Sequence, residues 1–82
     1  MKTEYEYILM SRLPQKGTTA VWQVENKSHG YRLGDIKWYG PFRQYAFFPA
    51  GGGLVFSIGC MADISEFIKA LAKEYRDAKK DV

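Results

Sequence analysis

The sequence predicts an α+β fold, a curved antiparallel sheet of four or five strands followed by one C-terminal amphipathic helix. Residues 4–56 form short alternating or aromatic-rich runs between Gly, Pro and polar turns, which is typical of antiparallel strands. Residues 57–80 carry apolar side chains at three- and four-residue steps, which indicates a helix. One helix covers only one side of a sheet, so we expect the other side to be exposed or covered by a second copy, as in a homodimer.

Length and composition predict a single domain over residues 1–82. The 46 % hydrophobic and 16 % aromatic content supports one core and excludes a disordered chain. The lone Cys60 cannot form an internal disulfide, which fits a reducing compartment. Because we find neither a signal peptide nor an apolar run of the ~20 residues that a bilayer requires, we expect a cytoplasmic protein with no membrane partner.

The first two strands are expected over residues 4–10 and 18–25. Both are rich in aromatic and aliphatic side chains, and Pro14 and Gly17 break the chain between them. The apolar face of the second strand consists of Ala20, Trp22 and Val24.

The third strand begins at Tyr31 and changes parity along its length. Its apolar positions are first odd, at Tyr31 and Leu33, and then even, at Ile36 and Trp38. Because strand side chains alternate between faces, the change requires one extra residue, and we expect a β-bulge at Gly34-Asp35.

A turn over Tyr39-Gly40-Pro41-Phe42 leads into a fourth strand over residues 42–48. Pro41 has no N–H for a central ladder, which marks the turn. Gly51-Gly52-Gly53 is expected to be a connector, since the Lys-Ser/Thr of a phosphate-binding loop does not follow it. Residues 54–56 are either a short last strand or an extended lead-in to the helix.

The helix is expected from Ser57, its N-cap, to about Lys80. Its apolar stripe consists of Cys60, Met61, Ile64, Phe67, Ile68, Leu71 and Tyr75. We expect Trp38 and Phe48 to be core residues that face this stripe.

The sequence offers little for catalysis, and we expect no enzyme, no metal and no cofactor. The only His29 falls in a turn and the only Cys60 at the start of the helix. A Cys–His dyad is open in principle, but the pattern favours a small core thiol and a solvated imidazole. No His, Cys and Asp residues have the spacing of metal ligands.

The middle of the chain is the candidate binding region. Residues 11–48 carry six cations and two anions, an excess of +4 in a chain of net charge +3. Single-stranded nucleic acid is often held by rings that stack on bases and cations that pair with phosphates. We therefore expect a nucleic-acid-binding face formed by Arg32, Lys37, Tyr39, Arg43 and Tyr45. The alternative is that the rings are core, with Lys37 and Arg43 at its rim.

Two stretches resemble small uncharacterised proteins of bacteriophages and integrated mobile elements. They are Leu33-Gly34-Asp35-Ile36-Lys37-Trp38-Tyr39-Gly40-Pro41-Phe42-Arg43-Gln44-Tyr45-Ala46-Phe47-Phe48-Pro49 and Cys60-Met61-Ala62-Asp63-Ile64-Ser65-Glu66-Phe67-Ile68. That family shows Trp-Tyr-x-x-Trp-Arg-Gln-Tyr-x-Phe-x-Pro and then Cys-Leu-x-Asp-Ile-x-x-Phe, with Trp often in the place of Phe42. The resemblance covers about half of the chain. It implies a phage or prophage origin and a place in the cytoplasm of the bacterial host, but no settled activity.

A looser resemblance links the architecture to the whirly-type transcriptional-coactivator fold. Proteins of that type dimerise and bind single-stranded DNA on curved sheets, so this resemblance implies a homodimer that binds single-stranded DNA. The alternative function is a protein-interaction module, such as a phage inhibitor that binds a host or defence protein. Fold-level likeness alone does not establish either function.

Overall fold

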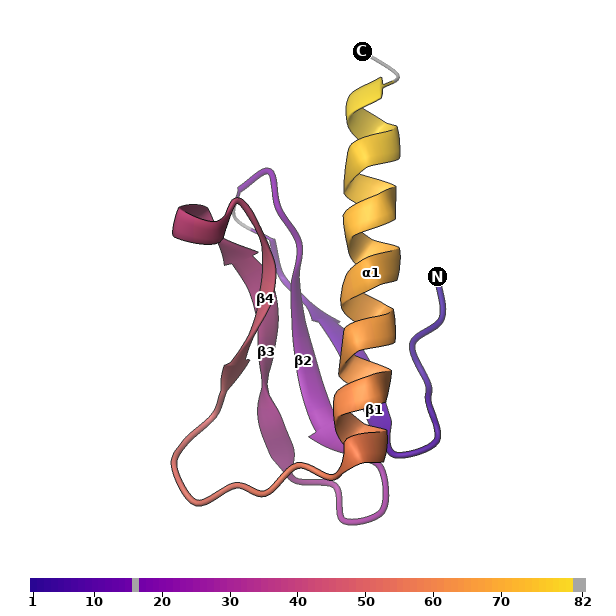
Figure 1. The fold of residues 1–82 in the computed structure, drawn as a ribbon, viewed down its shortest axis with the longest axis vertical. Helices are drawn as coiled ribbons and strands as arrows, with labels where there is room; N and C mark the ends of the chain where they lie inside the picture. Colours follow the sequence, from indigo (N-terminus) through magenta and orange to yellow (C-terminus); the bar gives the residue numbers. More distant parts are fainter. Residues whose placement is uncertain (16, 81–82) are drawn as a thin grey trace.

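A four-stranded antiparallel sheet and one C-terminal helix form two layers in a computed structural model, which describes residues 1–15 and 17–80 (Figure 1). The strands are β1 (Ile8–Leu13), β2 (Val21–Asn26), β3 (Arg32–Tyr39) and β4 (Gln44–Pro49), and they lie side by side in this order. Helix α1 (Ile58–Lys80) crosses one face of the sheet, and its last turns project beyond the strands. The predicted α+β arrangement is confirmed.

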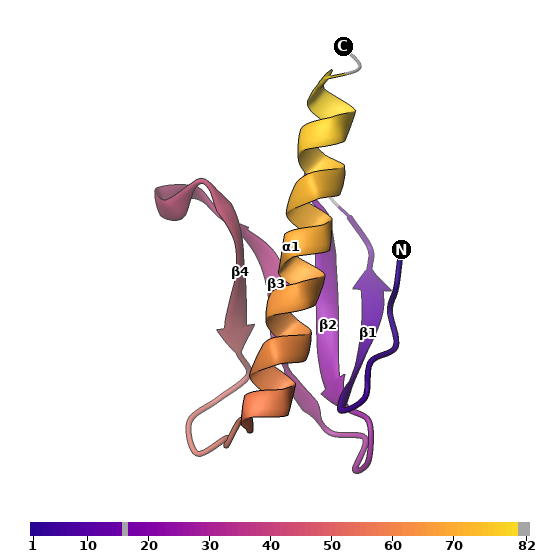
Figure 2. The same cartoon turned by 45° about the vertical axis from the view of Figure 1, so that its right-hand side comes forward.

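The chain before β1 folds back on that strand, so the predicted bounds of the first strand are wrong. Glu4 forms an antiparallel bridge with Leu9, and β1 itself continues to Leu13. The Tyr-rich run over residues 4–10 therefore makes two short antiparallel pieces instead of one strand. Figure 2 shows this N-terminal segment beside β1, at the opposite edge of the sheet from β4.

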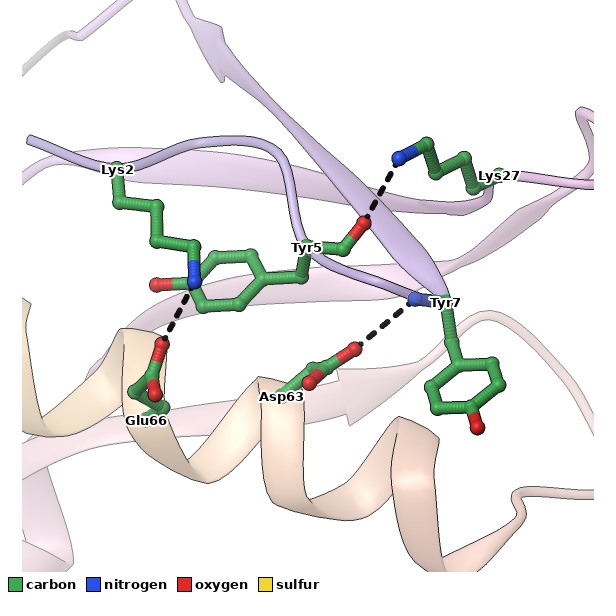
Figure 3. Close-up of polar contacts among 6 residues, drawn as sticks. All are labelled: Lys2, Tyr5, Tyr7, Lys27, Asp63 and Glu66. Carbon is green, nitrogen blue, oxygen red and sulfur yellow. Dashed lines mark hydrogen bonds and ion pairs between the residues drawn. The ribbon is translucent and has the colours of Figure 1, made fainter.

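Polar contacts hold the N-terminal segment between α1 and the turn that follows β2 (Figure 3). They join the Asp63 carboxylate to the Tyr7 backbone N–H at 3.1 Å, the Lys27 ammonium to the Tyr5 carbonyl oxygen at 3.0 Å, and Lys2 to Glu66 at 3.5 Å. The Tyr5 ring is buried and meets Phe67 edge to face, with 6.4 Å between ring centroids. The segment is thus part of the core and covers the β1 edge of the sheet.

The predicted β-bulge is present, one residue earlier than expected. Val24 of β2 lies opposite Gly34, whereas Glu25 lies opposite Arg32, so Leu33 has no residue opposite it. The extra residue lets Leu33 and Ile36 both enter the core, although they differ in parity.

The connection between β3 and β4 is longer than the sequence indicates. A 3₁₀ turn over Gly40–Phe42 and a left-handed Arg43 (φ 52°) come before β4, which begins at Gln44. The resulting register places Trp38 opposite Tyr45. Since opposite residues share a face, this register decides which side chains of β4 meet the helix.

The register corrects two predictions. Tyr45, expected on the exposed side with Lys37, lies on the helix side with Trp38 and is buried. Phe48, expected to face the helix, lies opposite Asp35 on the other side of the sheet. As predicted, Tyr45 and Phe47 lie on one face of β4 and Gln44, Ala46 and Phe48 on the other. The prediction is wrong about which of these two faces meets the helix.

Helix α1 begins as the sequence predicts. The Ser57 hydroxyl accepts a hydrogen bond from the Cys60 N–H at 3.1 Å, which is the geometry of an N-cap. Residues 54–56 form no strand and are the extended lead-in. Of the predicted stripe, Cys60, Ile64, Phe67 and Leu71 are buried, whereas Met61 is 52 % exposed at its margin.

The core fills the space between α1 and the sheet. Its largest fully buried side chains are Phe67, Ile8, Leu33, Ile36 and Val24. Trp22 also meets Phe67 edge to face, with 5.1 Å between ring centroids. Among the described residues, no helix combines the length and the apolarity that crossing a membrane requires.

Candidate nucleic-acid interface

The side of the sheet turned away from α1 is covered by no other described element, and we call it the open face. Trp22, Ile36 and Tyr45 face the helix. Because side chains alternate along each strand, the residues before and after each of these in its strand belong to the open face. It consists of Leu9, Ser11, Leu13, Val21, Gln23, Glu25, Arg32, Asp35, Lys37, Tyr39, Gln44, Ala46 and Phe48. Most of these side chains are half-buried by their neighbours, so the face is partly accessible to solvent.

One cation and three rings gather where the open face meets the turn between β3 and β4. The Lys37 ammonium lies over the Phe48 ring, 4.7 Å from its centroid. Tyr39 meets Phe48 edge to face at 5.7 Å and Phe42 at 4.6 Å between centroids. We call these four residues the open-face cluster. Phe42 is 64 % exposed, so the cluster offers an accessible ring beside a positive charge.

The lysine in this cluster keeps its charge available. A cation above a ring at an exposed site is stabilised by only about 0.5–1 kcal/mol, which a phosphate can exchange for a stronger ion pair. Lys37 is exposed and forms no ion pair with a described carboxylate. Its ammonium can therefore approach an anionic group without first leaving a carboxylate.

Arg32 also lies on the open face, but unlike Lys37 it is paired with a carboxylate. Its guanidinium donates two hydrogen bonds to the Asp35 carboxylate, at 2.7 and 3.3 Å, and this partner raises the pKa of Arg32. Glu25 lies opposite Arg32 on the neighbouring strand. The two carboxylates offset the charge of Arg32, so we assign Arg32 a smaller role than Lys37.

The remaining two predicted residues lie on the helix side of β4. Arg43 is exposed and lines a hollow together with Trp38 and Tyr75 of α1. Tyr45 is buried edge to face against Trp38, at 5.4 Å, and its hydroxyl accepts a hydrogen bond from the Ala20 N–H at 3.2 Å. Tyr45 is thus a core residue and presents no free ring to a base.

The structure brings together Lys37 and Tyr39 as the sequence predicts, and adds two rings that were not expected on this face, Phe48 and Phe42. Phe48 joins the cluster because of the β3–β4 register. Phe42 joins it because the 3₁₀ turn holds its ring outside the sheet, against Tyr39. Its position directly after Pro41 was the signal that it stands in the turn.

The residues with catalytic or metal-binding chemistry lie apart from one another. Cys60 is buried in the core at the start of α1, and His29 lies exposed in the turn after β2, where its ring stacks on Tyr31 with centroids 6.1 Å apart. Within residues 1–15 and 17–80, no three His, Cys, Asp or Glu side chains are grouped to hold a metal ion.

Comparisons of the chain with protein-family models, with curated proteins and with solved structures found no match. What can be inferred about function therefore comes from the geometry of the open-face cluster and of the other surfaces of the fold.

Proposed function

We propose that the protein binds single-stranded nucleic acid, with single-stranded DNA favoured, on the open face of its sheet. The observation that carries the proposal is the position of the Lys37 ammonium over Phe48, next to Tyr39 and the exposed Phe42. A base can stack on the exposed ring while the adjoining phosphate pairs with the lysine. Together they form a small site of the kind that binds without strong base preference.

The expected affinity is modest and depends on salt. Base stacking contributes roughly 1–3 kcal/mol per base, and two accessible rings supply a useful part of the binding free energy. With one or two phosphates neutralised, the logarithm of the binding constant falls with the logarithm of salt concentration with a slope of about −1. Such a site fits a small non-enzymatic binding protein of phage type, the origin that the resemblance implies. The homodimer stays a prediction.

The test is a titration of labelled single-stranded DNA and RNA oligonucleotides with the whole chain at low salt, followed by anisotropy. The intrinsic fluorescence of Trp22 and Trp38 is a poor reporter, because both indoles lie on the helix side of the sheet. We expect Lys37→Glu, Tyr39→Ala and Phe42→Ala each to weaken binding, by about tenfold for a loss near 1.4 kcal/mol.

Two matched controls separate the open face from general effects. Lys73→Glu reverses an exposed charge on α1, and Ile58→Ala removes a side chain that is 83 % exposed at the start of α1. Both should bind as the unmodified chain does. The proposal fails if the unmodified chain binds no oligonucleotide, or if Lys37→Glu and Lys73→Glu reduce binding equally.

A further inference from the structure

A second surface lies along the seam between β4 and α1, on the helix side of the sheet. It contains an open groove of about 520 Å³. The groove is lined by Phe47, Pro49, Phe56, Met61, Ile64, Ser65, Ile68 and Lys69. Phe47 and Phe56 meet edge to face there, with centroids 5.5 Å apart, and only Ser65 and Lys69 bring polar side chains. An apolar groove of this size accommodates side chains of an incoming segment.

The charges along the seam have one sign. Lys69 lines the groove, and Arg43 and Arg76 line the next hollow along the same seam. None of these three cations forms an ion pair with a described carboxylate. The acidic residues Asp63 and Glu66 of α1 instead point toward the N-terminal segment, where they bond to Tyr7 and Lys2 (Figure 3).

The backbone of β4 is open on this side. The Ala50 N–H bonds to the Leu33 carbonyl in β3, at 2.9 Å, so by alternation the N–H and C=O groups of Tyr45 and Phe47 point away from β3. β4 is the last strand of the sheet, and no described strand pairs with it there. The other edge of the sheet is covered by the N-terminal segment through the bridge of Glu4 with Leu9 (Figure 2).

We propose that the seam binds an extended acidic segment of a partner protein. The segment adds to the β4 edge as a further strand, places alternate apolar side chains in the groove, and pairs its carboxylates with Lys69, Arg43 and Arg76. Strand addition of this kind takes its affinity from main-chain hydrogen bonds and its specificity from pockets for alternate side chains. Here the complementary charge selects an acidic sequence.

The same charges argue against other occupants. A second copy paired β4 to β4 about a two-fold axis would bring the three cations of each copy into one interface, where they repel each other. A single nucleic-acid strand would meet the cations, but the two rings that line the groove, Phe47 and Phe56, are half-buried and pack edge to face against each other. This packing leaves little free ring surface in the groove for bases to stack on.

The experiment is a selection of random linear peptides on the immobilised whole chain, followed by affinity measurement of the enriched peptides. We expect enriched sequences that alternate apolar and acidic residues. The double variant Lys69→Glu with Arg76→Glu should weaken them at least tenfold. Ser65→Phe, which fills the groove from an exposed helical position, should also abolish binding without removing any core side chain.

A control keeps the two proposed surfaces apart. Lys37→Glu on the open face, on the other side of the sheet from the seam, should leave peptide binding unchanged. The proposal is overturned if no sequence is enriched, if enriched peptides lack acidic residues, or if the double variant binds them normally. It is also overturned if an oligonucleotide displaces the peptides, or if light scattering finds a dimer that Ser65→Phe converts to a monomer.

Discussion

The ring of Phe47 lies over Gly34 on the helix side of the sheet, so closely that a Cβ on Gly34 would sit 2.9 Å from two ring carbons. Gly34 follows the bulged Leu33 and stands between Val24 and Pro49 of the flanking strands. The aromatic side chain of one strand thus fills the place that the glycine of its neighbour leaves empty. This packing fixes the register of β3 against β4.

Gly34→Ala is therefore expected to destabilise the fold. The added methyl meets both the Phe47 ring and the Phe48 carbonyl oxygen, and backbone cannot move aside as a flexible side chain does. We expect the free energy of unfolding in urea to fall by about 3 kcal/mol, the upper range for an overpacked site. Gly51→Ala, with nothing near its Cβ position, is the control and should change it little. Equal losses would contradict the account.

Asp63→Ala should release the N-terminal segment from the helix. The carboxylate accepts the Tyr7 N–H at 3.1 Å, and its loss should cost about 1 kcal/mol. Hydrogen exchange at the Tyr7 amide should become faster, while Asp63→Asn, which keeps an acceptor oxygen, should show a smaller change. Asp77→Ala removes an exposed carboxylate 4.0 Å from Lys73 and should leave the exchange as it was. Unchanged protection in Asp63→Ala would exclude this tether.

The titration of Tyr5 should make stability fall at alkaline pH. Burial of the phenol, followed by the negative charges of Glu66 and Asp63, raises the pKa of Tyr5 above its ordinary value of 10.0. The folded state then holds the proton more tightly than the unfolded state. This contribution to stability is complete below pH 10 and is lost as the pH rises through the folded pKa.

Tyrosinate absorbance as a function of pH measures this shift. Glu66→Gln should lower the pKa of Tyr5 toward its ordinary value, because it removes the larger of the two neighbouring charges in the effect on Tyr5. Glu74→Gln, on the same helix, should leave it unchanged. A Tyr5 that titrates identically in the unmodified chain and in Glu66→Gln would rule out the electrostatic part.

Trp22→Phe should lower the free energy of unfolding only slightly, although the indole is a large buried side chain. The indole Nε1–H is buried and finds no acceptor among the residues that the structure describes. An unpaired buried donor is unfavourable by about 1–3 kcal/mol, which offsets much of the packing lost with the smaller ring. We expect thermal or urea unfolding to show a loss below about 1 kcal/mol, against about 3–5 kcal/mol for Phe67→Ala. A loss as large as that of Phe67→Ala would refute the offset.

The elements that the sequence predicts well are those whose signals are local. The stripe of α1 and its cap at Ser57 depend on neighbouring residues only. The cap is confirmed, and so is the stripe except at the exposed Met61. The bulge beside Gly34 follows from the parity of a single strand. The face of Tyr45 does not, because it depends on the length of the connection before β4, and a left-handed Arg43 leaves no clear mark in the sequence.

The candidate surfaces divide in the same way. Strand alternation alone puts Lys37 and Tyr39 on one face, so that part of the open-face cluster could be predicted. The groove beside Phe47 could not, because it depends on where α1 crosses the sheet. That crossing is fixed by contacts distant in the sequence, such as the bond between Tyr7 and Asp63.

The same bond has a consequence for the newly made chain. Tyr7 and Asp63 are 56 residues apart, and synthesis runs from the N-terminus, so the first segment leaves the ribosome well before its partner on α1 exists. The hairpins β1–β2, β2–β3 and β3–β4 are local and can pair early, but the apolar face that carries Ile8 and Ile36 has no cover until α1 emerges. During that interval the nascent sheet is prone to aggregate. The exposed apolar face is buried only when α1, which is translated last, packs against it.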